Sequence, residues 1–134
     1  MSQENVELVR SITAPWEHGD FSSTEWAHPE IELVIADGPS PGSWTGLAGM
    51  AEGWRDFLGA WEDYRCEGEE YRELDDERVL VLIHRTGLGK SSGLGLGHMQ
   101  TKGANLFHVR DDRVTRLVLY FDPRRALADL GLSE

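Results

Sequence analysis

The chain has 134 residues, of which 40% are hydrophobic and 28% charged, a composition typical of one globular domain spanning residues 1–134. Its formal net charge of −11 argues against nucleic acids and anionic membranes as partners, because phosphate binding needs clustered Lys and Arg. Cys66 is the only cysteine, so we predict neither a disulfide framework nor a Cys-based zinc site. No apolar run approaches the ~20 residues of a membrane helix. The polar first residues do not resemble a signal peptide, so we expect a cytoplasmic protein.

The first half of the chain predicts helices separated by one strand. Apolar residues at helical spacing predict a first helix that ends near Gly19: Val6, Val9, Ile12 and Trp16. A short second helix is expected around 25–27, and a strand over 31–36. Residues 37–46 contain three Gly and two Pro and are expected to form a loop. Residues 47–64 give the clearest helical pattern, with Trp54, Phe57 and Trp61 on one face.

From Cys66 onward the apolar pattern changes to that of strands. We predict strands over 66–74, 79–84, 99–109 and 113–122, with a turn at 75–78 and a glycine-rich loop at 87–97. The run 79–84 is continuously apolar, which indicates a strand covered on both faces. A last helix over 123–130 is expected to stop at Gly131. Helices followed by a run of antiparallel strands predict an α+β fold.

The last hairpin has two distinct faces. Residues 105–109 and 113–122 flank a turn at 110–113, and alternation places two sets of side chains on opposite sides of the second strand. One set is Thr115, Leu117, Leu119 and Phe121, and the other is Val114, Arg116, Val118, Tyr120 and Asp122. Asn105 falls on the inward face, where an unpaired amide costs ~1–3 kcal/mol. It therefore needs a partner, for which His84 and His98 are candidates.

Five local phrases, in order along the chain, are similar to those of the SnoaL-like group of the NTF2-like superfamily. They are WEHGD at 16–20, HPEIE at 28–32, Gly46 followed by Met50 and Trp54, and the stretches 107–118 and 120–131. This resemblance implies a cone-shaped α+β barrel, in which a curved antiparallel or mixed sheet wraps around three helices. It also implies an apolar pocket inside the cone and a homodimer formed through the outer face of the sheet.

Within such a cone, large apolar side chains are expected to line the pocket. The candidates are Trp16, Trp54, Phe57, Trp61, Phe107, Leu117, Leu119 and Phe121. Each of them also suits an ordinary hydrophobic core, and in a cone some serve both roles. The number of aromatic rings favours a flat, apolar small molecule as the ligand over a sugar or a phosphate. We expect no cofactor, and the scattered histidines predict no metal site.

The resemblance also assigns candidate catalytic residues. Registered on the ketosteroid isomerases of the superfamily, Asp37 takes the place of the carboxylate base and Asn105 that of the neutral acid, or the place next to it. Ile12 takes the place of the tyrosine and cannot donate a hydrogen bond, which argues against ketosteroid isomerase activity. An epoxide hydrolase of this fold would need an Asp-Arg-Asp relay, for which Asp37, Arg85 and Asp122 supply the residue types.

SnoaL-type cyclases add another candidate, because they use an acidic residue near the end of the sheet. Asp122 fits that role, although Asp followed by Pro123 equally predicts a helix N-cap. Asp37 has its own alternative as a turn residue at the start of a Gly/Pro loop. The leading hypothesis is a protein that binds a small apolar molecule and carries out acid/base chemistry through Asp37, assisted by Asn105 and a histidine such as His98. The alternative is a non-catalytic ligand-binding or dimerisation module.

Overall fold

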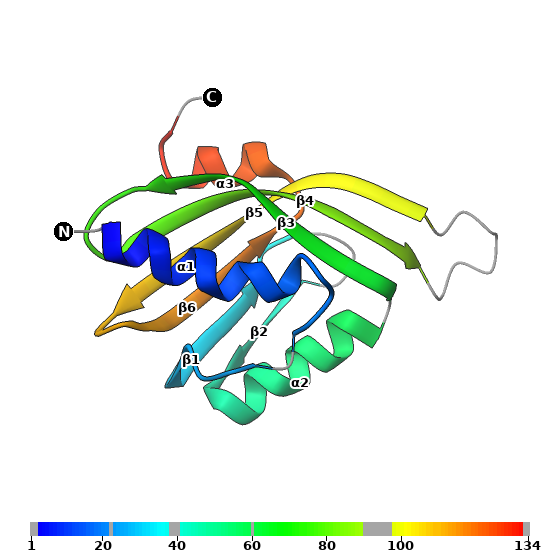
Figure 1. The fold of residues 1–134 in the computed structure, drawn as a ribbon, viewed down its shortest axis with the longest axis horizontal. Coiled ribbons are helices and arrows are strands. Elements are labelled where there is room, and N and C mark those ends of the chain that lie inside the picture. Colours follow the sequence, from blue (N-terminus) through cyan, green and yellow to red (C-terminus); the bar gives the residue numbers. More distant parts are fainter. Residues whose placement is uncertain (1–2, 22, 38–40, 60, 90–97, 133–134) are drawn as a thin grey trace.

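The computed structural model describes residues 3–21, 23–37, 41–59, 61–89 and 98–132. Within these ranges the chain forms three helices and six strands (Figure 1). The helices are α1 (Gln3–Trp16), α2 (Gly46–Gly59) and α3 (Pro123–Asp129). The strands are β1 (Ala27–Ile35), β2 (Gly42–Thr45), β3 (Trp61–Glu73), β4 (Arg78–Gly89), β5 (His98–Arg110) and β6 (Arg113–Tyr120). The predicted α+β class is confirmed.

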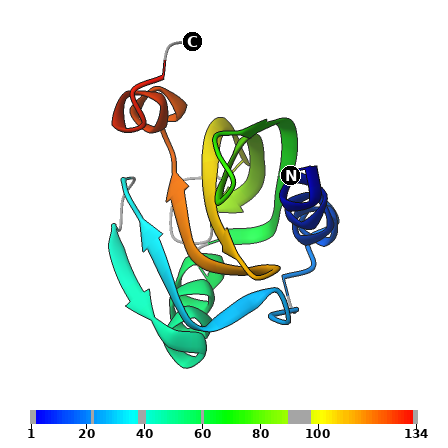
Figure 2. The same ribbon diagram turned by 90° about the vertical axis from the view of Figure 1, so that its left-hand side faces the viewer.

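The strands form one mixed sheet in the order β2-β1-β6-β5-β4-β3. β1 and β6 pair in parallel and the other neighbours are antiparallel, so the sheet is open, with β2 and β3 at its edges. Figure 2 shows the sheet curving strongly, which produces the expected cone. α1 and α2 pack on the inner face and α3 on the outer face (Figures 1 and 2).

The predicted alternation of faces in the hairpin is confirmed for residues 117–120. It is wrong for Val114, which lies in the inner core because the β5–β6 register shifts between His108 and Val109. Leu117 and Leu119 join Phe107 in the inner core, whereas Val118 and Tyr120 pack under α3 on the outer face. The strand predicted over 79–84 is covered on both sides in the same way, with its odd-numbered residues inside. The β5–β6 turn consists of Asp111 and Asp112, both with positive φ (53° and 64°), as in a type I′ turn.

Two predictions for the segment before α2 are wrong. Residues 25–26 form a turn instead of a helix, because Trp26 is buried and its indole Nε1 donates to the Ser23 carbonyl at 2.8 Å. The backbone carbonyl of Trp26 then accepts from Val114 of β6 at 2.8 Å, so the strand begins at once. The expected loop 37–46 contains the edge strand β2, whose Trp44 packs against the inner core.

The helix predicted over 47–64 is too long. α2 ends at Gly59, and Trp61 opens β3, where it pairs with Gly89 of β4. The helical spacing of apolar residues extends to Trp61 only by coincidence, because Trp61 already belongs to β3. Farther along β3, strand alternation places Tyr64 and Cys66 in the inner core. None of the helices that the structure describes is long and apolar enough to cross a membrane.

Candidate functional site

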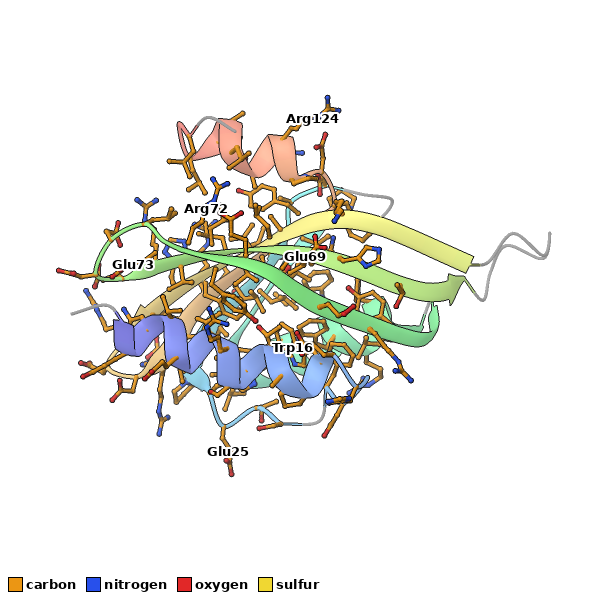
Figure 3. All side chains as sticks on the ribbon, turned by 45° about the horizontal axis from the view of Figure 1, so that its top comes forward. Trp16, Glu25, Glu69, Arg72, Glu73 and Arg124 are labelled. Carbon is orange, nitrogen blue, oxygen red and sulfur yellow. The ribbon has the colours of Figure 1, made fainter. Side chains whose placement is uncertain are left out.

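Aromatic side chains form a continuous group inside the cone. Trp16 and Trp54 meet at 5.4 Å between ring centroids, and Phe57 contacts Trp54, Tyr64 and Phe121 at 6.0, 5.2 and 5.9 Å. Trp16, Trp54 and Tyr64 are buried, whereas Phe57 and Phe121 are only half-buried. Figure 3 shows Trp16 between α1 and the sheet. The group therefore runs from the buried core to the two partly exposed rings near α2 and the end of β6. We call the part of the cone that holds these two rings its partly open end.

Arg85 of β4 is the central polar side chain at this end, and it is 0% exposed. Its Nε donates to the Tyr64 hydroxyl at 2.9 Å, Nη1 to the Tyr120 carbonyl at 2.8 Å, and Nη2 to Asn105 Oδ1 at 3.4 Å. Its Cζ atom lies 4.6 Å from the centre of the Phe121 ring, a cation–π distance. The charge is thus held against one aromatic face and three neutral acceptors.

Asn105 finds the partners that its inward position required. Besides accepting from Arg85, its Nδ2 donates to Cys66 Sγ at 3.7 Å. Gly103, two residues earlier on the same strand, provides the space for the guanidinium. A Cβ at Gly103 would lie 2.0 Å from Nη1 of Arg85 and 2.8 Å from the Tyr120 carbonyl oxygen.

The two acidic protons nearest Arg85 stay in place at neutral pH. Burial raises the pKa of Tyr64, although the nearby Arg85 acts in the opposite direction. Burial likewise raises the pKa of the Cys66 thiol to about 11. Both groups are therefore neutral, and neither compensates the charge of Arg85.

We predict from this that Cys66 is unreactive in the folded protein. The thiolate is the reacting species, and a pKa of about 11 leaves roughly one hundredth of the thiolate that an ordinary cysteine has at pH 8. Modification by a disulfide reagent at pH 8 should be at least about 100-fold slower than in the same protein unfolded in guanidinium chloride. Similar rates in the two conditions would show that Cys66 is accessible.

Asp37 lies just after β1 and is half-buried. Its two carboxylate oxygens accept from the backbone N–H groups of Phe121 and Asp122, at 2.6 and 3.1 Å. The carboxylate thus ties the end of β1 to the end of β6, beside the half-buried Phe121 ring. Its predicted role as a general base stays a prediction.

The other candidate catalytic residues are not brought together. Asp122 is the N-cap of α3 and accepts from the Arg124 backbone N–H at 2.9 Å, as its alternative reading predicted. His84 lies on the outer face, away from Asn105. His98 begins β5, but its side chain lies outside the described residues, as does that of Trp61. Arg85 forms no ion pair with either aspartate of the hypothetical relay in the described part of the chain.

Not all of the expected pocket residues reach the partly open end. Four of them are buried in the inner core with at most 3% exposure: Trp16, Phe107, Leu117 and Leu119. Among the expected lining residues whose side chains are described, only Phe57 and Phe121 are partly exposed. No group of three His, Cys, Asp or Glu side chains suited to a metal ion occurs in the described ranges.

Sequence reasoning gave little weight to Arg85 and none to Gly103. The predicted strand ended at His84, so the alternation of Val79, Val81 and Ile83 was not continued to Arg85. Continuing it by one step places a charged side chain inside the cone. The importance of Gly103 is hidden for a different reason, because it depends on the register in which β5 pairs with β4, and the sequence does not indicate that register.

Comparison with known proteins agrees with this architecture. A family model for the SnoaL-like domain matches residues 9–117. No curated protein matches the chain in sequence. Several solved structures match nearly the whole chain.

A protein from Jannaschia sp. CCS1 assigned as a SnoaL-like polyketide cyclase is 14% identical, with a TM-score of 0.73 and coverage of 99% of this chain and 95% of its own. A ketosteroid isomerase-like protein from Catenulispora acidiphila, in complex with trimethylamine, is 17% identical, with a TM-score of 0.70 and coverage of 95% and 94%. TerC, co-crystallised with polyporic acid, is 23% identical, with a TM-score of 0.70 and coverage of 95% and 97%. At these identities the likeness concerns the fold.

Proposed function

The chain belongs to the SnoaL-like domain family, and from this premise we propose that it binds a small, flat, largely apolar molecule at the partly open end of its cone. The observation that carries the proposal is the exposure of aromatic rings. Phe57 and Phe121 are only partly buried although they continue a buried aromatic group. Flat rings that remain accessible beside a buried polar cluster suit a ligand with one apolar face and few polar atoms.

The solved relatives support a ligand-binding role in general terms. One is a complex with trimethylamine and another was co-crystallised with polyporic acid. Neither molecule is assigned to this chain, because the fold hosts many unrelated functions. Binding is also better supported than acid/base catalysis, since both oxygens of Asp37 already accept backbone N–H groups.

We expect methyl 2-naphthoate, a flat and uncharged probe, to bind at this end of the cone. In ¹H–¹⁵N correlation spectra, the amides near Phe57 and Phe121 should shift on titration. Replacing Phe57 by alanine should weaken binding by about 3- to 10-fold, because one aromatic contact contributes roughly 0.5–1.5 kcal/mol beyond burial. The dissociation constants from the titrations check this.

Leu47→Ala provides the matched control. Leu47 lies on the same helix, is 40% exposed and is not part of the aromatic group, so its loss should leave binding unchanged. Shifts confined to amides of the outer face, or an equal loss of affinity in both variants, would contradict the proposal.

A further inference from the structure

Arg85 carries a positive charge into the interior, where no carboxylate of the described residues pairs with it. Its side chain is fully buried, and its three hydrogen bonds go to neutral acceptors on Tyr64, Tyr120 and Asn105. Among the described side chains, no Asp or Glu forms an ion pair with it. A buried charge without a counterion costs several kcal/mol. Since an apolar side chain would avoid this cost, the arrangement favours a functional role for the positive charge, such as binding a ligand.

The guanidinium also has hydrogen-bonding capacity to spare. It carries five N–H groups, of which three make the bonds to Tyr64, Tyr120 and Asn105. The bond from Nη2 to Asn105 is long, at 3.4 Å. Two N–H groups therefore point to no acceptor among the described residues, and both lie on the terminal nitrogens that bind carboxylates side by side.

The surroundings fix the guanidinium in this position. Gly103 leaves the space that Nη1 occupies, since any Cβ there would lie 2.0 Å away. The Phe121 ring lies 4.6 Å from Arg85 Cζ and is only half-buried, so an aromatic ring in contact with the guanidinium is itself partly exposed. Asp37 holds the Phe121 backbone at 2.6 Å, which leaves the ring as the movable part.

We propose that Arg85 anchors an ionised oxygen of the ligand, a carboxylate or an enolate-type oxygen, while the apolar part of the ligand stacks on Phe57 and Phe121. This inference rests on the proposed function, because it assigns the polar end of the same ligand. The net charge of −11 repels anions in general. A preference for an anionic ligand must therefore come from a local site such as Arg85.

The test compares 2-naphthoate with its methyl ester at pH 7.5 on the unaltered protein. Hydrogen bonds to a charged group should make the anion bind about 10- to 100-fold more tightly than the ester. The side-chain Nε–Hε resonance of Arg85 should shift with 2-naphthoate and stay in place with the ester. Both readouts use the wild-type chain and do not depend on the folding of a variant.

Arg85→Met removes the charge while keeping an unbranched side chain, and it should reduce the anion preference to about one while the ester still binds. Arg116→Met is the control, because it makes the same change of charge on the outer face, where Arg116 pairs with Glu32 at 3.3 Å. It should keep the full preference.

The outcomes separate this inference from the proposed function. Equal affinities for the anion and the ester in the wild type, or a preference that survives Arg85→Met, would overturn the anchor and leave apolar binding intact. Failure of both probes to bind would overturn the proposed function itself. An unmoved Arg85 Nε–Hε resonance with bound 2-naphthoate would also overturn the anchor, even if Arg85→Met does not fold.

Discussion

Replacing Gly103 by alanine is expected to lower the free energy of unfolding by about 1–3 kcal/mol and to abolish the anion preference. The added Cβ would overlap Nη1 of Arg85 at 2.0 Å and crowd the Tyr120 carbonyl at 2.8 Å. The Tyr120 carbonyl belongs to the backbone of the neighbouring strand, so the guanidinium has to move. It would then lose its bond to that carbonyl. Urea unfolding measures the loss of stability.

Two other glycines provide controls for this substitution. No atom of the described residues lies within 4 Å of a Cβ at Gly59, so Gly59→Ala should change stability little. At Gly68 the three atoms nearest to a Cβ belong to the ring and hydroxyl of the half-buried Tyr71, with the hydroxyl at 2.3 Å, and a side chain can rotate away whereas the Tyr120 backbone carbonyl cannot. Gly68→Ala should therefore cost less than Gly103→Ala. Equal losses at positions 59 and 103 would contradict the steric account.

A double variant isolates the contact with Arg85. Adding Arg85→Met to Gly103→Ala replaces the rigid guanidinium by a flexible chain that can avoid the new methyl group. The combined loss should be smaller than the sum of the single losses by at least ~0.5 kcal/mol, as expected for residues in direct contact. Additive losses would show that the methyl group acts only on the backbone.

Local chemistry made most of the fold predictable. The β5–β6 hairpin was identified because alternation and a short Asp-Asp turn both act within a few residues. The end of α3 at Gly131 and its Asp122 cap depend on equally local rules. The errors occur where pairing between strands, and not the local sequence, determines the secondary structure. Trp61 is an example, because it continues a helical pattern but pairs with β4.

The candidate site was harder to predict than the fold. Asn105 was recognised as needing a partner, but its partners, Arg85 and Cys66, lie 20 and 39 residues away on other strands. Only the sheet register brings them together, and a shift of one residue would turn Arg85 outward. Asp37 was noted as an acid, yet its contacts with 121 and 122 arise from a parallel pairing that sequence does not indicate.

We expect Asp37 to act as a structural clamp, meaning that its carboxylate holds the end of β6 against the end of β1. Asp37→Ala should lower the free energy of unfolding by about 2 kcal/mol, because each buried hydrogen bond to a charged group contributes roughly 1.5–3 kcal/mol. Asp37 is half-buried, which reduces the expected sum. Asp37→Asn should lose nearly as much, since an amide has only one acceptor oxygen for the two N–H groups of Phe121 and Asp122. Its NH₂ group would then face a backbone donor.

The two roles considered for Asp37 give opposite results in this experiment. A clamp predicts that both variants unfold at lower urea concentration, while Asp56→Asn, an exposed aspartate of α2, unfolds as the wild type does. A clamp also predicts weaker binding of 2-naphthoate, because the strand end that carries Phe121 is no longer held. A general base makes no demand on stability, so Asp37→Asn with wild-type unfolding would contradict the clamp. Because the Asp37 oxygens already hold two N–H groups, we expect the clamp.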